Sequence, residues 1–81
     1  MNKYEKQKAE YFATATIPDG YFGSTDSVSL SLMDGIILCV SQYGFFRSPL
    51  PDAVDVNEAI WLLENHPSSH GYFKNIKIKG Q

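Results

Sequence analysis

Two histidines, His66 and His70, are separated by three residues in the segment HPSSH and are the first side chains that could do chemistry. Histidines at this spacing bind zinc in zinc fingers, where they lie on a helix and two cysteines complete the site. Here Pro67 and two serines lie between them, and the chain's one cysteine, Cys39, is distant in the sequence. We therefore interpret HPSSH as a polar turn and expect neither a metal site nor a cofactor.

The candidate nucleophiles lack the surroundings that catalysis requires. A catalytic thiol needs an exposed, electropositive position, whereas the strand pairing argued below places Cys39 among aliphatic residues. Ser24 and Ser48 have no nucleophile-elbow pattern around them. The segment GYFG at 20–23 lacks the lysine and the Ser or Thr of a phosphate-binding loop. The sequence therefore predicts a protein that is not an enzyme and has no catalytic residues.

Length and composition predict one folded domain over residues 1–81, with residues 1–8 frayed or helical. A hydrophobic content of 43% supports a modest core and argues against disorder. The net charge of −2 gives no bulk attraction to nucleic acid or to anionic lipid. The longest apolar run, GIILCV at 35–40, is too short to cross a bilayer, and no signal peptide is visible. One cysteine cannot form an internal disulfide, so we expect a cytoplasmic protein that does not bind membranes.

Alternating polar and apolar residues predict three antiparallel strands in the first part of the chain. Residues 9–17 are rich in threonine and aromatic residues, which favours a strand with Tyr11 on the same side as the alanines. A helix over residues 3–13 is the alternative, because that stretch also contains many helix formers. Residues 27–33 alternate strictly between serine and apolar residues, and residues 36–46 form the returning strand.

The dipeptide Asp34–Gly35 between the second and third strands predicts a type I′ hairpin turn. This turn fixes the register, which pairs Met33 with Ile36, Leu32 with Ile37, Leu30 with Cys39, and Val28 with Ser41. Cys39 then faces the core. Leu38 and Val40 face the other way, beside serines, and need a cover from a helix, another strand or a second subunit.

A short helix and a last strand follow. Asp55 and Glu58 have the capping-box pattern, the apolar residues of 56–65 fall on one arc, and Pro67 ends the helix. Residues 72–80 alternate again and predict an edge strand whose lysines face solvent. The predicted fold is α+β: a small two-layer sandwich with one helix packed on an antiparallel sheet of about four strands, in the order β-β-β-α-β.

Trp61 lies on the polar arc of this helix, with Glu58 and Glu64 beside it, which is an unusual place for a tryptophan that serves only folding. Either its side chain is exposed, or the N-terminal segment or the loop at 47–53 covers it. A chain this small cannot bury all its aromatic residues, so some belong to a rim or an interface. The predicted partner-binding residues are Trp61, Glu58, Glu64, Tyr43, Phe45 and Phe46.

These observations predict a non-catalytic protein–protein interaction module, with an unidentified partner protein or a second copy in a homodimer. Its size compares with that of small inhibitors and adaptors carried by bacteriophages and mobile elements, and its acidic middle suits a basic partner. The alternative is single-stranded nucleic-acid binding by the last strand, where aromatic residues interleave with lysines that neutralise phosphates. The residues of that alternative site are Tyr72, Phe73, Lys74, Lys77 and Lys79.

Overall fold

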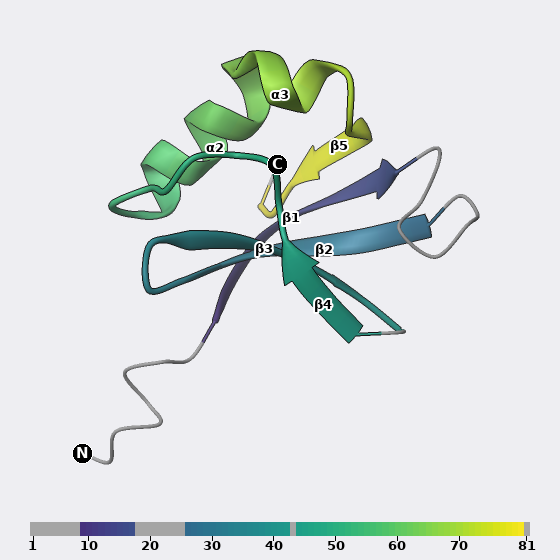
Figure 1. Cartoon of the computed structure of the whole chain (residues 1–81), viewed down its shortest axis with the longest axis horizontal. Coiled ribbons are helices and arrows are strands. Elements are labelled where there is room, and N and C mark those ends of the chain that lie inside the picture. Colours follow the sequence, from purple (N-terminus) through teal and green to yellow (C-terminus); the bar gives the residue numbers. More distant parts are fainter. Residues whose placement is uncertain (1–8, 18–25, 43, 81) are drawn as a thin grey trace.

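A computed structural model of the chain describes residues 9–17, 26–42 and 44–80, which contain a five-stranded antiparallel sheet with helix α2 packed on it (Figure 1). The elements are β1 Glu10–Ile17, β2 Asp26–Met33, β3 Ile36–Ser41, β4 Gly44–Arg47, α2 Val56–Asn65, α3 Pro67–His70 and β5 Lys74–Ile78. The strands lie in the order β4-β3-β2-β1-β5, so β4 and β5 are the edges. The predicted α+β class, with one main helix on an antiparallel sheet, is confirmed.

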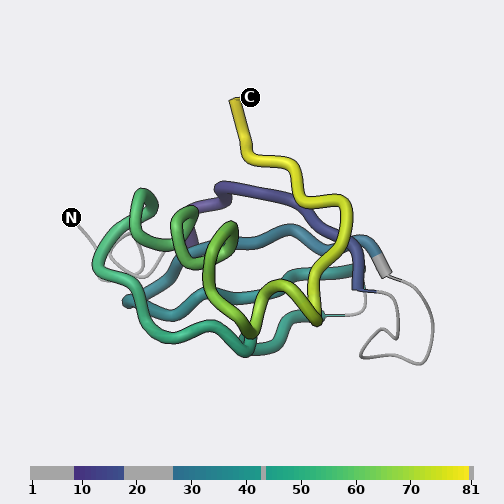
Figure 2. The backbone as a smooth tube through the Cα atoms, turned by 90° about the horizontal axis from the view of Figure 1, so that it is seen from above, coloured from purple at the N-terminus to yellow at the C-terminus, as the bar shows by residue number. Residues whose placement is uncertain are grey.

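Both described helices lie on the same side of the sheet. Figure 1 shows α2 and α3 above the strands, and Figure 2 looks down on the α2 trace as it passes over them. No described helix lies on the other side. We call the side toward α2 the core face and the other side the open face.

Strand β1 decides between the two predictions for the N-terminal part of the chain. Glu10–Ile17 is a strand that pairs with β2 on one side and with β5 on the other. The alternative helix over residues 3–13 is therefore wrong for residues 10–13. Residues 1–8, which we predicted to be frayed or helical, lie outside the described residues.

The predicted facing of β1 is wrong at its start because of a β-bulge at Phe12. Tyr11 pairs with Ser31, but Ala13 pairs with the next residue of β2, Leu30, so two residues of β1 lie opposite one. Phe12 turns into the core and is 2% exposed, whereas Tyr11 is 40% exposed. The bulge therefore places Tyr11 on the open face and not on the side of Ala13.

The β2–β3 hairpin forms as predicted. Asp34 and Gly35 have φ values of 51° and 82°, and a type I′ turn requires positive φ at both central residues. The ladder contains the predicted pairs Met33–Ile36, Leu32–Ile37 and Leu30–Cys39. Its last pair is Ser29–Val40, and the predicted Val28–Ser41 pair is not part of it.

The single returning strand predicted over residues 36–46 is wrong. The chain reverses after Ser41, and residues 44–47 come back as β4, antiparallel to β3. Gly44 has a φ of 136°, a value that residues with a Cβ rarely adopt, and the reversal depends on it. This second hairpin raises the number of strands from the predicted four to five within the described residues.

The core lies between the sheet and α2. The three buried residues of the helix are Ala59, Leu62 and Leu63, which belong to the predicted apolar arc. At its start, Asp55 Oδ1 accepts a hydrogen bond from the Glu58 N–H at 2.9 Å, as the predicted cap requires. The core residues are Phe12, Ala13, Ala15, Ile17, Val28, Leu30, Ile37, Cys39, Leu50, Ala53, Ala59, Leu62, Leu63, Phe73 and Ile78.

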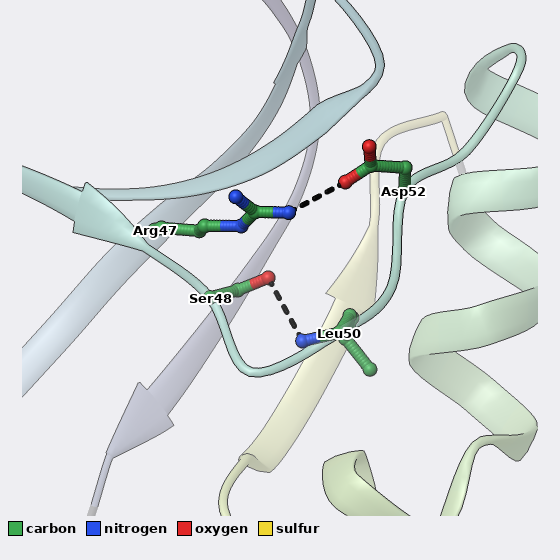
Figure 3. A network of polar contacts seen from close by, with 4 residues as sticks. All are labelled: Arg47, Ser48, Leu50 and Asp52. Atoms are coloured by element: carbon green, nitrogen blue, oxygen red, sulfur yellow. Dashed lines mark hydrogen bonds and ion pairs between the residues drawn. The ribbon is translucent and has the colours of Figure 1, made fainter.

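The loop between β4 and α2 is fastened to the body of the protein (Figure 3). Arg47 donates to Asp52 at 2.7 Å, and the Leu50 N–H donates to Ser48 Oγ at 3.3 Å. The ion pair is exposed and adds little stability by itself, but Leu50 is 3% exposed and anchors the loop in the core. The loop therefore fixes the point at which α2 begins.

The end of α2 gives a stability prediction. The Leu63 carbonyl cannot receive a helical hydrogen bond from Pro67, which has no N–H, and the buried Ser69 hydroxyl donates to it instead. Ser69→Ala should lower the free energy of unfolding by about 1–3 kcal/mol, because it leaves this carbonyl without that partner. Urea denaturation measures the loss. The exposed neighbour gives the control, since Ser68→Ala should change stability by less than about 0.5 kcal/mol; equal losses in both variants would contradict this assignment.

Candidate functional site

The HPSSH segment forms the short helix α3, where we predicted a polar turn. His66 caps it: its Nδ1 accepts a hydrogen bond from the Ser68 N–H at 3.1 Å. His70, at the other end of α3, is exposed. Among the described residues, no group of three or more His, Cys, Asp or Glu side chains could hold a metal ion. The role that the structure gives His66 is a structural one.

Cys39 lies in the core, as predicted from its pairing with Leu30, and is 0% exposed. Burial raises the pKa of its thiol from 9.0 to about 12, because a thiolate in the core would lose its hydration. The thiolate is the nucleophilic form of cysteine, and it is not populated at neutral pH in this position. The fold therefore keeps this thiol inert.

The raised pKa of Cys39 predicts a loss of stability in alkaline solution. Below pH 9.0 the thiol is protonated in both the folded and the unfolded chain. From there to about pH 12 the unfolded chain releases the proton and the folded chain keeps it. Stability therefore falls as pH rises, by up to about 1.4 kcal/mol per pH unit. Urea midpoints measured across this window should fall less steeply for Cys39→Ala than for the wild type; parallel curves would contradict the prediction.

The first candidate surface lies on the outer side of α2. Trp61 is 59% exposed, so neither the loop at 47–53 nor any other described segment covers its side chain. Val54, just before the helix, is 86% exposed, and Glu58 and Glu64 are exposed as well. We call these four residues, Val54, Glu58, Trp61 and Glu64, the α2 surface.

A groove continues the α2 surface toward the edge of the sheet. It has a volume of about 510 Å³ and is lined by Glu64, Ile76, Lys77 and Ile78. Ile76 is half-buried and packs against the core. The groove combines two isoleucines with one acidic and one basic side chain, next to a surface whose centre is an exposed indole.

The structure separates the residues that we predicted as one partner-binding surface. Phe45 pairs with Val40 on the open face and is 70% exposed. Phe46 pairs with Cys39, faces the core and is partly buried. Trp61 lies on the side of α2 away from the buried residues Ala59, Leu62 and Leu63, so Trp61 and Phe45 are on opposite sides of the molecule. Tyr43 lies outside the described residues.

The second candidate surface is the open face, whose composition changes from one edge to the other. Lysines lie on β5, mostly hydroxyl side chains on β1 and β2, and mostly apolar side chains on β3 and β4, where Arg47 is the basic exception. By register and alternation, the open face comprises Lys74, Lys77, Tyr11, Thr14, Thr16, Ser27, Ser29, Ser31, Met33, Ile36, Leu38, Val40, Phe45 and Arg47. Three of its members are exposed large hydrophobic residues: Tyr11, Val40 and Phe45.

The structure keeps only part of the nucleic-acid surface predicted for residues 72–80. Phe73 is 4% exposed, and Tyr72 is partly buried against the core, with the two rings in edge-to-face contact at 4.9 Å. Neither ring is placed to stack a base. The three lysines, Lys74, Lys77 and Lys79, are exposed. The lysines of the predicted site are accessible to a ligand. Aromatic rings that stack on its bases have to come from other parts of the molecule.

No described helix is long and apolar enough to span a bilayer. In comparisons with known proteins, no family, no curated protein and no solved structure matches this chain. The two surfaces of the molecule are therefore the features from which a function can be inferred.

Proposed function

We propose that this chain is a non-catalytic protein-binding domain that contacts its partner through the α2 surface. The observation that supports this most directly is the 59% exposure of Trp61 at the middle of a helix whose other side is buried. Tryptophan is strongly enriched at binding hot spots. Val54, the most exposed large hydrophobic residue among those described, lies at the start of the same helix.

The α2 surface is rigid, which favours tight binding. Asp55 and Glu58 cap the helix: Asp55 accepts from the Glu58 N–H, and Glu58 Oε1 accepts from the Val54 N–H at 2.8 Å. Leu63 is 1% exposed and holds the helix on the sheet. A surface held in this way loses little conformational entropy when a partner binds.

The charges of the α2 surface favour a basic partner. Glu58 and Glu64 flank Trp61, and residues 54–65 contain no lysine or arginine. Opposite charge across an interface speeds association and selects the partner, so association should slow as salt is raised. A basic protein with an apolar pocket for the indole fits this arrangement.

The proposed role is that of an inhibitor or adaptor, because such a protein needs only a shaped surface. The comparison in size with small proteins of bacteriophages and mobile elements supports this role by analogy alone. We propose the cytoplasm as its location, since the one cysteine is a free thiol buried in the core.

Affinity capture from a lysate of the source organism or its host tests the proposal. Wild type, Trp61→Ala and Phe45→Ser are used side by side, and retained proteins are identified by mass spectrometry. A protein retained by wild type and by Phe45→Ser, but lost with Trp61→Ala, would support the α2 surface. A protein retained equally by Trp61→Ala, or lost only with Phe45→Ser, would contradict it. Circular dichroism confirms that each variant is folded.

A further inference from the structure

Three lysines form a row along the β5 edge of the open face, and a bulge in β5 is needed to align them. In a regular strand Lys74 would point to the core face, since side chains alternate. Lys74 pairs with Thr16. Lys77, three residues later, pairs with Thr14, which is only two positions along β1. Asn75 is the inserted residue of the bulge. Its φ is 53°, a conformation that asparagine adopts more readily than most residues. Lys74 therefore lies on the same face as Lys77.

Lys79 extends the row beyond the end of β5. Its Nζ lies 5.4 Å from the ring centroid of Tyr11, a residue of the open face. Lys77 and Lys79 are two residues apart, which along a strand is roughly 6.6 Å. That spacing is comparable with the distance between successive phosphates of an extended single strand of nucleic acid. We call Lys74, Lys77 and Lys79 the lysine row.

A shallow cavity opens beside the lysine row. Its volume is about 180 Å³, and it is lined by Thr14, Ala15, Thr16, Ser27, Asn75 and Lys77. These side chains offer three hydroxyls, one amide and one ammonium as hydrogen-bond donors, and no carboxylate is among them. Phosphate oxygens only accept hydrogen bonds. The donor set therefore suits a phosphate group.

Most of the acidic side chains that the structure describes lie in the loop and helix layer, and Glu10 and Asp34 are the others. The ionised side chains on the open face are all basic. The acidic side chains of the loop and helix layer are Asp52, Asp55, Glu58 and Glu64. Asp52 is paired with Arg47, and Glu64 lines a groove together with Lys77, but no carboxylate lines the cavity beside the lysine row. The net charge of −2 for the whole chain therefore does not reflect the local charge of the open face, which is positive.

We propose that the lysine row and its cavity bind the phosphate backbone of a single-stranded nucleic acid. Its bases lie toward the middle of the open face, where the ring of Tyr11 is 40% exposed and the hydroxyl group of Ser27 is accessible. Aromatic rings with a basic groove are the usual means of binding single strands without sequence preference. The lysine row shares no residue with the α2 surface, although Lys77 also lines the groove beside that surface, and the proposal does not rest on the proposed protein-binding function.

Fluorescence anisotropy with a labelled oligothymidylate tests the proposal. Three phosphate contacts predict that the logarithm of the binding constant falls with the logarithm of salt concentration with a slope of about −2. The variant Lys74→Ala/Lys77→Ala should reduce this slope to about −0.7 and weaken binding roughly tenfold per lysine at about 0.05 M salt. Both lysines are exposed, so the variant should fold, which circular dichroism verifies.

A control with the same change in net charge separates a local site from bulk charge. Asn57→Asp/Asn65→Asp also lowers the net charge by two, but on the side of α2, and should bind the oligonucleotide within about twofold of wild type. Failure of wild type to bind at low salt, or equal weakening in both double variants, would overturn the proposal. Competition by polyglutamate as effective as that by unlabelled oligothymidylate would also overturn it and indicate an acidic protein as the ligand.

Discussion

Replacing Trp61 with alanine should weaken binding to the captured partner protein by roughly 30-fold or more. Truncating a hot-spot tryptophan costs about 2 kcal/mol or more of binding free energy, which corresponds to this change in Kd. The fold should persist, because the side chain is 59% exposed and alanine has a higher helix propensity than tryptophan. Isothermal titration calorimetry gives the Kd, and urea denaturation should show a change of less than about 0.5 kcal/mol.

Two further variants show whether the indole itself is responsible. Trp61→Phe keeps an aromatic ring on the α2 surface and should lose less affinity than Trp61→Ala. Phe45→Ser removes an even more exposed ring from the opposite side of the molecule and should leave the Kd unchanged. An affinity of Trp61→Ala within about threefold of wild type would show that Trp61 is not a hot spot.

Leu63→Ala should have the largest effect on stability, lowering the free energy of unfolding by about 3 kcal/mol. Leu63 is 1% exposed and projects from α2 into the core, so its removal takes away apolar contacts and leaves a cavity. For a chain of this size the loss is a large fraction of a total of about 4–12 kcal/mol. Urea denaturation monitored by circular dichroism measures it.

The neighbouring residue gives the matched control for this change. Glu64→Ala alters the same turn of α2 at an exposed position and should change stability by less than about 0.5 kcal/mol. A loss for Leu63→Ala no larger than that for Glu64→Ala would show that α2 is not held on the sheet in the way described. The affinity for a partner should fall in Leu63→Ala only in proportion to the unfolded fraction.

Features fixed by local chemistry could be predicted from the sequence. Asp34 and Gly35 strongly favour a type I′ turn. This turn sets the register between β2 and β3, and the register places Cys39 on the core face. The cap made by Asp55 followed in the same way from residue types and spacing. In each case a few neighbouring residues decide the backbone conformation, with no help from the rest of the fold.

Features that depend on one inserted residue could not be predicted. The bulges at Phe12 and Asn75 each shift by one position the alternation of side chains between the two faces. The first moved Tyr11 to the open face, and the second moved Lys74 there. The turn before Gly44 lacks the Asn-Gly or Asp-Gly pair that marks short hairpins. The sequence therefore predicts β3 and β4 as one continuous strand.

For the candidate sites too, features set by local sequence could be predicted and features set by tertiary packing could not. The position of Trp61 on the polar side of α2 could be predicted, because the apolar arc of the helix is clear. Its exposure could not be predicted, because it depends on whether a distant loop covers the side chain. The interleaving of aromatic residues with lysines predicts Phe73 as part of the nucleic-acid surface. The chain enters β5 from α3 with this ring turned into the core. Which surface a side chain joins is decided by tertiary packing.

Fluorine NMR of the protein labelled with fluorotryptophan tests the proposed contact surface most directly. Trp61 is the only tryptophan, so the label gives one resonance from the α2 surface, and the partner protein adds none. In the free protein the resonance should be sensitive to exchange of H2O for D2O, because the side chain is 59% exposed. With the captured partner at saturation it should shift and lose that sensitivity. A complex that forms while the resonance stays unchanged and solvent-sensitive would contradict the proposal that the α2 surface binds the partner.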